Sequence, residues 1–165
     1  MKNRSVNILI VGLLLLVIMS VILVVFVEHA HGRFKEDITV SENGVTESVK
    51  TVRGLKLNPT ESKEYRVNLL CKASGDYYIY IDYTETHDGG MKKFVNATVS
   101  LGDTVLYSGS LADLLDTDAV IEFVGTLEEE DPLPIVFHYE MPREIGNEAQ
   151  GTSSDFDIEF KIVKK

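Results

Sequence analysis

Cysteine is almost missing from this sequence, and tryptophan is missing altogether: Cys71 is the single thiol. One cysteine excludes any disulfide within the chain, so the fold must be stabilised by the packing of apolar side chains. Cys71 follows Tyr65, Val67 and Leu69 in an alternating tract, and we interpret it as a small buried apolar residue of a strand. Pairing with the cysteine of a second chain is the alternative.

Basic residues are also few. Lysine and arginine number 16 against 26 aspartates and glutamates, which gives a formal net charge of −10 at pH 7. No cluster of basic residues interrupts this balance, so neither a nucleic-acid partner nor anionic lipid headgroups bound through a basic patch are expected. The acidic run at residues 128–131 lacks the glycine and the alternating spacing of a calcium loop, and we interpret it as solvated charge.

Catalytic motifs are absent from the sequence as well. It contains no Gly-x-Ser-x-Gly, no glycine-rich phosphate loop and no His-Glu-x-x-His. His29 and His31 have no third metal ligand nearby in sequence. His87 lies in a predicted loop and His138 on the outer face of a predicted strand, and an enzyme would need them to converge with carboxylates. We therefore expect no catalytic residue, no metal, no cofactor and no enzymatic activity.

One long uncharged segment, residues 6–27, lies near the N-terminus. As a helix it would be about 33 Å long, which matches a hydrocarbon core of about 30 Å. Lys2 and Arg4 precede it, which keeps the N-terminus in the cytoplasm and places the rest outside. The small residues of Ala30-His31-Gly32 leave cleavage as a signal peptide open beside a retained membrane anchor. The protein is then either a single-pass membrane protein with an outer C-terminal domain or a secreted one.

The rest of the chain has a period of two. Phe156, Ile158, Phe160 and Ile162 alternate with charged residues, and similar tracts lie around residues 77–83 and 135–141. Such alternation indicates strands with one buried and one solvated face, typical of antiparallel sheets. Further strands are predicted at residues 49–57, 63–72, 94–101, 104–107 and 119–127, with a weaker one at 38–41. The expected fold class is all-β, an antiparallel jelly roll or β-sandwich preceded by one N-terminal hydrophobic helix.

Three segments follow from this pattern. Residues 1–32 are a cytoplasmic tip with a transmembrane anchor or signal peptide, residues 33–48 are a stalk or donor strand, and residues 49–165 are the sandwich domain. Within that domain, Ser110 is predicted to cap a short helical turn. Tyr78 and Tyr80 share the face of their strand opposite the core-facing set. If that face is covered they are structural, and if it is open they form an aromatic strip suited to a carbohydrate or protein ligand.

Three stretches resemble a known group. The C-terminal one, residues 139–151 (YEMPREIGNEAQG), runs into the strand Ser154-Asp155-Phe156-Asp157-Ile158. The others are residues 57–62 (LNPTES), similar to a turn that is usually Pro-Gly, and residues 106–111 (LYSGSL), similar to a Leu-Tyr-x-Gly-x-Leu turn. Together they are similar to the TasA/camelysin group of exported proteins of Gram-positive bacteria (the SipW-dependent type).

The resemblance implies an exported jelly roll and, for the best-known members, a fibre subunit of the biofilm matrix whose N-terminal strand completes the sheet of its neighbour. On this chain the strand would contain Phe34, Ile38 and Val40. The metallopeptidase label attached to camelysin transfers no ligand set to this sequence.

The residues of the C-terminal motif support a structural interpretation of its loop. Pro142 ends a strand, Gly146 and Gly151 permit a positive φ, and the amides can hydrogen-bond the backbone of the loop. The motif residues are Pro142, Gly146, Asn147, Glu148, Gln150 and Gly151.

The function expected from the sequence is a non-catalytic structural or assembly protein of the cell envelope or extracellular matrix, polymerising by strand donation or bound to another envelope protein. A membrane-anchored surface binding module is the alternative, and a camelysin-like metallopeptidase comes third.

Overall fold

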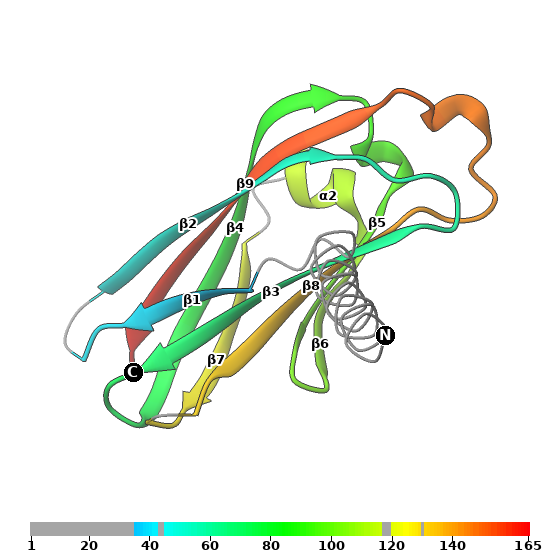
Figure 1. Ribbon diagram of the computed structural model, residues 1–165. Helices are drawn as coiled ribbons and strands as arrows, with labels where there is room; N and C mark the ends of the chain where they lie inside the picture. The colour runs from blue at the N-terminus through cyan, green and yellow to red at the C-terminus, as the bar shows by residue number, and fades with distance from the viewer. Residues whose placement is uncertain (1–34, 43–44, 117–119, 130) are drawn as a thin grey trace, which may run out of the picture. The chain divides into compact units, whose positions relative to one another are not determined.

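The computed structural model describes residues 35–42, 45–116, 120–129 and 131–165 (Figure 1). The predicted N-terminal hydrophobic helix and Phe34 lie outside these ranges. Within them, no helix has the length and apolar character needed to cross a bilayer. The chain divides into two compact units, Met1–Arg33 and Phe34–Lys165, and the description below concerns the second.

Two sheets make up this unit. The five-stranded sheet has the order β1 (Lys35–Val40), β3 (Ser62–Cys71), β8 (Leu133–Glu140), β5 (Asn96–Leu101) and β6 (Thr104–Ser110). The four-stranded sheet has the order β2 (Val45–Leu55), β9 (Ser153–Lys164), β4 (Gly75–Gly89) and β7 (Ile121–Leu127). Every pair of neighbouring strands is antiparallel except β1 and β3, which are parallel. The predicted all-β fold of antiparallel sheets is confirmed, and the parallel edge pair was not foreseen.

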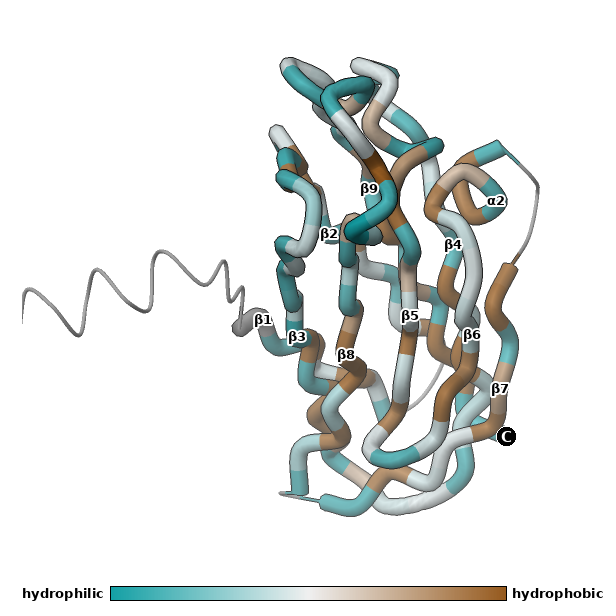
Figure 2. The backbone as a smooth tube through the Cα atoms, turned by 90° about the vertical axis from the view of Figure 1, so that its right-hand side faces the viewer, coloured by the Kyte–Doolittle hydropathy of each residue, from teal (hydrophilic) through white to brown (hydrophobic). Residues whose placement is uncertain are grey.

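The core lies between the two sheets and is filled by the alternate residues of each strand. Figure 2 shows hydrophobic and hydrophilic residues alternating along the strands. Its centre is aromatic. Phe137 of β8 packs edge-on against Phe160 of β9, with ring centroids 6.0 Å apart, and Tyr139 packs in the same way against Phe156 at 5.6 Å. Tyr83 of β4 approaches Phe156 at 5.9 Å. Edge-to-face pairs of this kind add to the free energy of simple area burial, so they join the sheets.

Helical structure is limited to α2 (Leu111–Asp116) and two short 3₁₀ turns, η1 (Lys92–Phe94) and η2 (Asn147–Ala149), among the described residues. The hydroxyl of Ser110 accepts a hydrogen bond from the N–H of Ala112 at 3.0 Å. Leu111 and Leu114 are fully buried. The helical turn capped by Ser110 is therefore confirmed.

The segment expected to be a stalk or donor strand, residues 33–48, contributes β1 and the start of β2. β1 forms the edge of its own chain's five-stranded sheet beside β3, and β2 forms one edge of the other sheet (Figure 1).

Candidate functional site

The outward side chains of the four-stranded sheet align in rows across β2, β9, β4 and β7. One row is apolar and contains Val45, Val163, Tyr78 and Val124. The next contains Glu47, Lys161, Tyr80 and Glu122. A third contains Val49, Glu159 and Asp82. We call these residues, together with Val120 before β7, the valine–tyrosine face.

Valine is unusually exposed on this face. Val45, Val49, Val120 and Val124 keep 50%, 56%, 47% and 48% of their surface in solvent. Among the described residues, Val105 of β6 is the one other large apolar residue exposed to this degree, and it lies on the other sheet. Singly scattered apolar residues are ordinary, whereas apolar residues gathered on one surface mark interaction sites.

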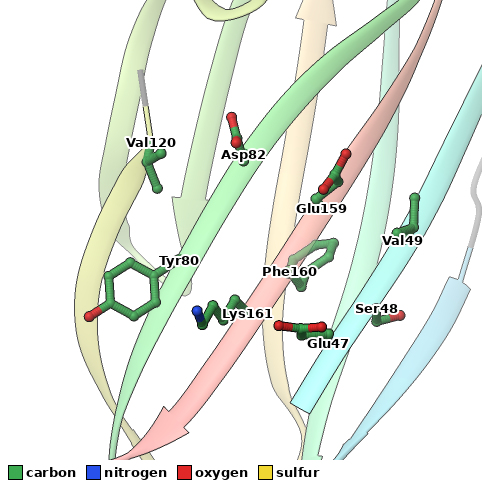
Figure 3. Close-up of a pocket in the computed structure, with 9 residues that line it drawn as sticks. All are labelled: Glu47, Ser48, Val49, Tyr80, Asp82, Val120, Glu159, Phe160 and Lys161. Carbon is green, nitrogen blue, oxygen red and sulfur yellow. The ribbon is translucent and has the colours of Figure 1, made fainter. Parts of the chain in front are cut away.

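A shallow hollow of about 410 Å³ crosses the valine–tyrosine face. Glu47, Lys161 and Tyr80 follow one another across β2, β9 and β4, and Val120 lies just before β7 (Figure 3). The hollow is therefore bordered by apolar, aromatic and charged groups of β2, β9 and β4 and by Val120.

Acidic groups outnumber basic ones on this face. Its carboxylates are those of Glu47, Asp82, Glu122 and Glu159, and its one ammonium group within the strand rows is that of Lys161. Within the described ranges, the recorded ion pairs involve Glu64, Glu85, Asp88, Asp116 and Glu140, and none of these four carboxylates. Within the described part of the chain, the carboxylates of this face therefore outnumber the ammonium groups near them.

Tyr78 and Tyr80, the predicted surface tyrosines, both lie half-buried on this face, while Tyr77 and Ile79 between them are fully buried in the core. Desolvation raises the pKa of the Tyr80 phenol, and the neighbouring Glu122 carboxylate raises it further. The Nζ of Lys165 lies 5.9 Å from the ring centroid of Tyr78. Both tyrosines keep part of their surface in solvent, so the aromatic strip is open.

The predicted donor strand is fully integrated in this chain. Ile38 and Val40 of β1 are 4% and 1% exposed and lie opposite Leu69 and Cys71 of β3. The Nδ2 of Asn68 on β3 donates a hydrogen bond to the Oδ1 of Asp37 at 2.7 Å. Cys71 is a free, buried thiol, as the alternation predicts.

The motif loop between β8 and β9 is tied by its own groups. The side-chain amide of Gln150 donates a hydrogen bond to the Oδ1 of Asn147 at 3.1 Å. The backbone N–H of Gln150 also donates to the backbone carbonyl of Asn147 at 3.1 Å. Gly151 has φ +75°, as expected. Gly146 was expected to allow a positive φ and instead has φ −85°, a value open to any residue. Pro142 lies two residues after the end of β8 at Glu140, and Glu148 is exposed within η2.

Two of the recognised stretches meet in space. The turn at Asn58-Pro59 and the loop from Gly146 to Thr152 line a hollow of about 360 Å³. Thr60 N–H donates to the carbonyl of Met141 at 2.9 Å, which joins the turn to the end of β8. Backbone hydrogen bonds therefore hold both the turn and the loop that line this hollow.

The histidines do not converge. His87 lies on β4 and His138 on β8, in different sheets. No group of three or more histidine, cysteine, aspartate or glutamate side chains within the described ranges is arranged to hold a metal ion.

Lys92 forms a charge cluster that the sequence did not suggest. Its Nζ lies 2.6 Å from Asp116, 2.7 Å from Glu85 and 3.4 Å from Asp88, and its side chain is 14% exposed. The hydrogen bonds that the Lys92 ammonium donates to Asp116 and Glu85 raise the pKa of Lys92 above its ordinary value. The ammonium therefore neutralises three carboxylates that would otherwise repel one another.

Replacing Lys92 by methionine should lower the free energy of unfolding by about 2 kcal/mol at pH 7, because charge-assisted hydrogen bonds are lost and the carboxylates are left together. Since the pKa of Lys92 is raised on folding, this contribution is complete below its ordinary value of 10.5 and is lost as the pH rises further. Urea unfolding of Lys92→Met beside Lys93→Met measures it. An equal loss in both variants would contradict the role of the cluster.

Comparisons with known proteins give only distant structural likenesses. No protein-family model matches the chain, and no curated protein matches it. The crystal structure of FlhE is similar over 74% of this chain and 100% of its own, with 13% identity and a TM-score of 0.44. PliG of Aeromonas hydrophila, a periplasmic inhibitor of g-type lysozyme, matches over 79% and 98% with 11% identity and a TM-score of 0.33. The C-terminal CBM6 of the laminarinase LamC from Zobellia galactanivorans matches over 73% and 100% with 14% identity and a TM-score of 0.31.

Sequence reasoning missed the valines and the unpaired carboxylates of the valine–tyrosine face. Val45 and Val49 lie on β2, whose alternation is weak, so the pattern did not assign them to a face. The signal that was available is the pair Val120 and Val124, which flank the acidic Glu122 on the solvated side of a predicted strand.

Proposed function

We propose that this chain is a non-catalytic structural protein of the cell envelope or extracellular matrix of a Gram-positive-type bacterium, similar to the TasA/camelysin group, which assembles by exchange of β1 between subunits. Its N-terminal segment either anchors it in the cell membrane, with the sandwich outside, or is removed on secretion. The observation that carries the proposal is the position of β1: it is N-terminal, lies at a sheet edge and pairs with one strand only.

The strand order supports a jelly roll as the finer description of the fold. If β1 is set aside, the sheets are β2-β9-β4-β7 and β3-β8-β5-β6. Apart from β5 and β6, which are neighbours in one sheet, successive strands from β2 to β9 cross between the sheets, as two interleaved Greek keys require. Thr60 adds support at the proline turn, because its φ of +73° is a conformation that suits glycine, the residue found there in the Pro-Gly turn of the TasA/camelysin group.

β1 is well suited to exchange. Its register with β3 is continuous from Lys35 opposite Arg66 to Val40 opposite Cys71, so its attachment combines main-chain pairing with the burial of Ile38 and Val40. Residues 41–44 alone separate it from β2, which belongs to the other sheet. If β1 of one chain occupied β3 of the next, the same contacts would form between subunits, and an open, head-to-tail series would grow into a filament.

A single new cysteine tests this proposal. Val40 and Cys71 are register partners and both are buried, and neighbouring strands lie about 4.8 Å apart, within the range that a disulfide spans. We expect full-length Val40→Cys, oxidised under mild conditions, to give a ladder of covalent oligomers on non-reducing gels. The ladder should collapse to monomer when reductant is added.

Two controls separate exchange from random oxidation. Val40→Cys combined with Cys71→Ser lacks the second thiol, and Thr39→Cys places the new thiol opposite Leu70. Neither should form the ladder. A Val40→Cys protein that oxidises completely to a monomer, with both thiols blocked, would show that β1 remains in its own chain and would overturn the proposal.

A surface binding module is the second candidate function. The observation that favours it is the open valine–tyrosine face with its hollow of about 410 Å³. The two functions use different surfaces, since β1 belongs to the five-stranded sheet and the valine–tyrosine face to the other.

A further inference from the structure

The valine–tyrosine face combines two features that together restrict what can bind to it. Four valines keep between 47% and 56% of their surface in solvent, and burying such apolar area is favourable at about 25 cal/mol per Å². Four carboxylates lie among them with no recorded ion pair in the described part of the chain. A partner must therefore provide apolar side chains and positive charge in the same surface.

A second copy of this chain does not meet that requirement. Packing two such faces together would bring Glu47, Asp82, Glu122 and Glu159 against the same groups of the other copy. Like charges that face each other across an interface cost free energy and suppress association. The ammonium groups of Lys161 within the strand rows and of Lys165 beside Tyr78 are outnumbered two to one by these carboxylates on each face.

A carbohydrate is also less well matched than a cationic partner. A sugar needs an open aromatic ring face, and the ring of Tyr78 already has the ammonium group of Lys165 at 5.9 Å from its centroid. That contact is instead a cation–π interaction of the sort that a lysine or arginine of a partner makes.

We infer that the valine–tyrosine face binds a cationic, apolar polypeptide segment of another protein, in which basic and aliphatic side chains alternate. The apolar side chains would lie over Val45, Val49 and Val124, and the basic ones would reach the carboxylates of Glu47, Glu122 and Glu159. This inference rests on the exposure and charge of the face and does not depend on exchange of β1, so the cysteine experiment above can fail without affecting it.

The probe is a short dye-labelled peptide of alternating lysine and valine, titrated with the full-length chain in a nonionic detergent and followed by fluorescence anisotropy. Peptides of alternating glutamine and valine, and of alternating lysine and serine, each remove one of the two features. We expect the lysine–valine peptide to bind more tightly than either, and its binding to weaken as salt is added.

Matched variants locate the binding on the protein. Glu47→Gln with Glu122→Gln should weaken it about tenfold, because two exposed ion pairs to the lysines of the peptide are lost. Val49→Ser with Val124→Ser should weaken it by a similar factor. The controls are Glu64→Gln with Glu140→Gln, which removes the same charge from the five-stranded sheet, and Val105→Ser, which removes an equally exposed valine there.

Three outcomes would overturn the inference. Equal weakening by the controls would show that the peptide responds to overall charge and not to this face. Concentration-dependent dimers that are lost in Val49→Ser would identify a second copy as the occupant. Binding of a β-1,4-linked glucose oligosaccharide that is lost in Tyr80→Ala, without binding of the lysine–valine peptide, would identify a carbohydrate.

Discussion

Replacing Phe137 by alanine should lower the free energy of unfolding by about 4 kcal/mol, the largest loss expected from any single substitution described here. Phe137 is fully buried on β8, the central strand of the five-stranded sheet, and its ring meets Phe160 and Tyr83 of the other sheet at 6.0 and 6.5 Å. Truncation would leave a cavity between the two sheets, and both sheets would have to shift to fill it. Since small domains are stable by only about 5–15 kcal/mol, much of the margin would be lost.

Urea unfolding followed by tyrosine fluorescence measures this loss, because the chain has no tryptophan. Phe123→Ala is the matched control: Phe123 lies on β7, an edge strand, and is half-buried. It should lose clearly less stability. If both variants lost the same amount, the aromatic centre between the sheets would not be the main source of stability.

Alkaline pH should destabilise the protein through two buried tyrosines. Tyr83 and Tyr139 lie inside the core with their hydroxyl oxygens 3.4 Å apart, and desolvation raises the pKa of both above the ordinary value of 10.0. A raised pKa means that the folded state holds these protons more tightly than the unfolded state. The contribution is therefore complete below pH 10.0 and is lost as the pH rises. At about pH 11 each buried tyrosine should reduce the free energy of unfolding by about 1.4 kcal/mol.

Comparing unfolding at pH 8 and about pH 11 in the wild type and in Tyr83→Phe tests this expectation. The variant cannot ionise at that position, so its stability should fall by about 1.4 kcal/mol less than that of the wild type. Lys92 also loses its contribution to the free energy of unfolding at alkaline pH. This loss is the same in the wild type and in Tyr83→Phe, so it cancels when the two falls in stability are subtracted. Equal falls would contradict the assignment to Tyr83.

The alternation of residues predicted those strands whose buried face is continuous. Phe156, Ile158, Phe160 and Ile162 of β9 are all buried, as expected, because period-two patterning and burial are the same property in a strand covered on one side. The helical turn after Ser110 was likewise predictable from the spacing of its leucines and from the capping serine. These elements were predictable because residues close together in the sequence determine them.

β2 shows where the pattern fails. Val52 and Leu55 are both buried although they are three positions apart, because the register with β9 shifts between them beside Gly54, whose φ is +61°. Such a bulge reverses which residues face inward. Before it, Val45 and Val49 point to solvent while Ser48 and Lys50 point inward, and period two could not identify which set was exposed.

Pairing between distant strands was not predictable either. Alternation in residues 38–41 indicated a weak strand, and nothing in it specified β3 as the neighbour or a parallel direction. The valine–tyrosine face depends on the same information, since Glu47, Tyr80 and Glu122 come from three strands far apart in the chain and become one row only through β9. A single sequence therefore predicts which face of a strand is buried better than it predicts which strands pair.

The central place of the last strand has a consequence for the order in which the protein can form. β9 ends at Lys164, and it is the strand that joins β2 to β4, with Val45 opposite Val163. Until the residues of β9 have left the ribosome, β2 has no neighbour in its sheet. The four-stranded sheet therefore cannot close before β9 has been synthesised, and contacts this distant in sequence make closure slow. A chain stalled or truncated within β9 would leave the four-stranded sheet open, even if other strands had already paired.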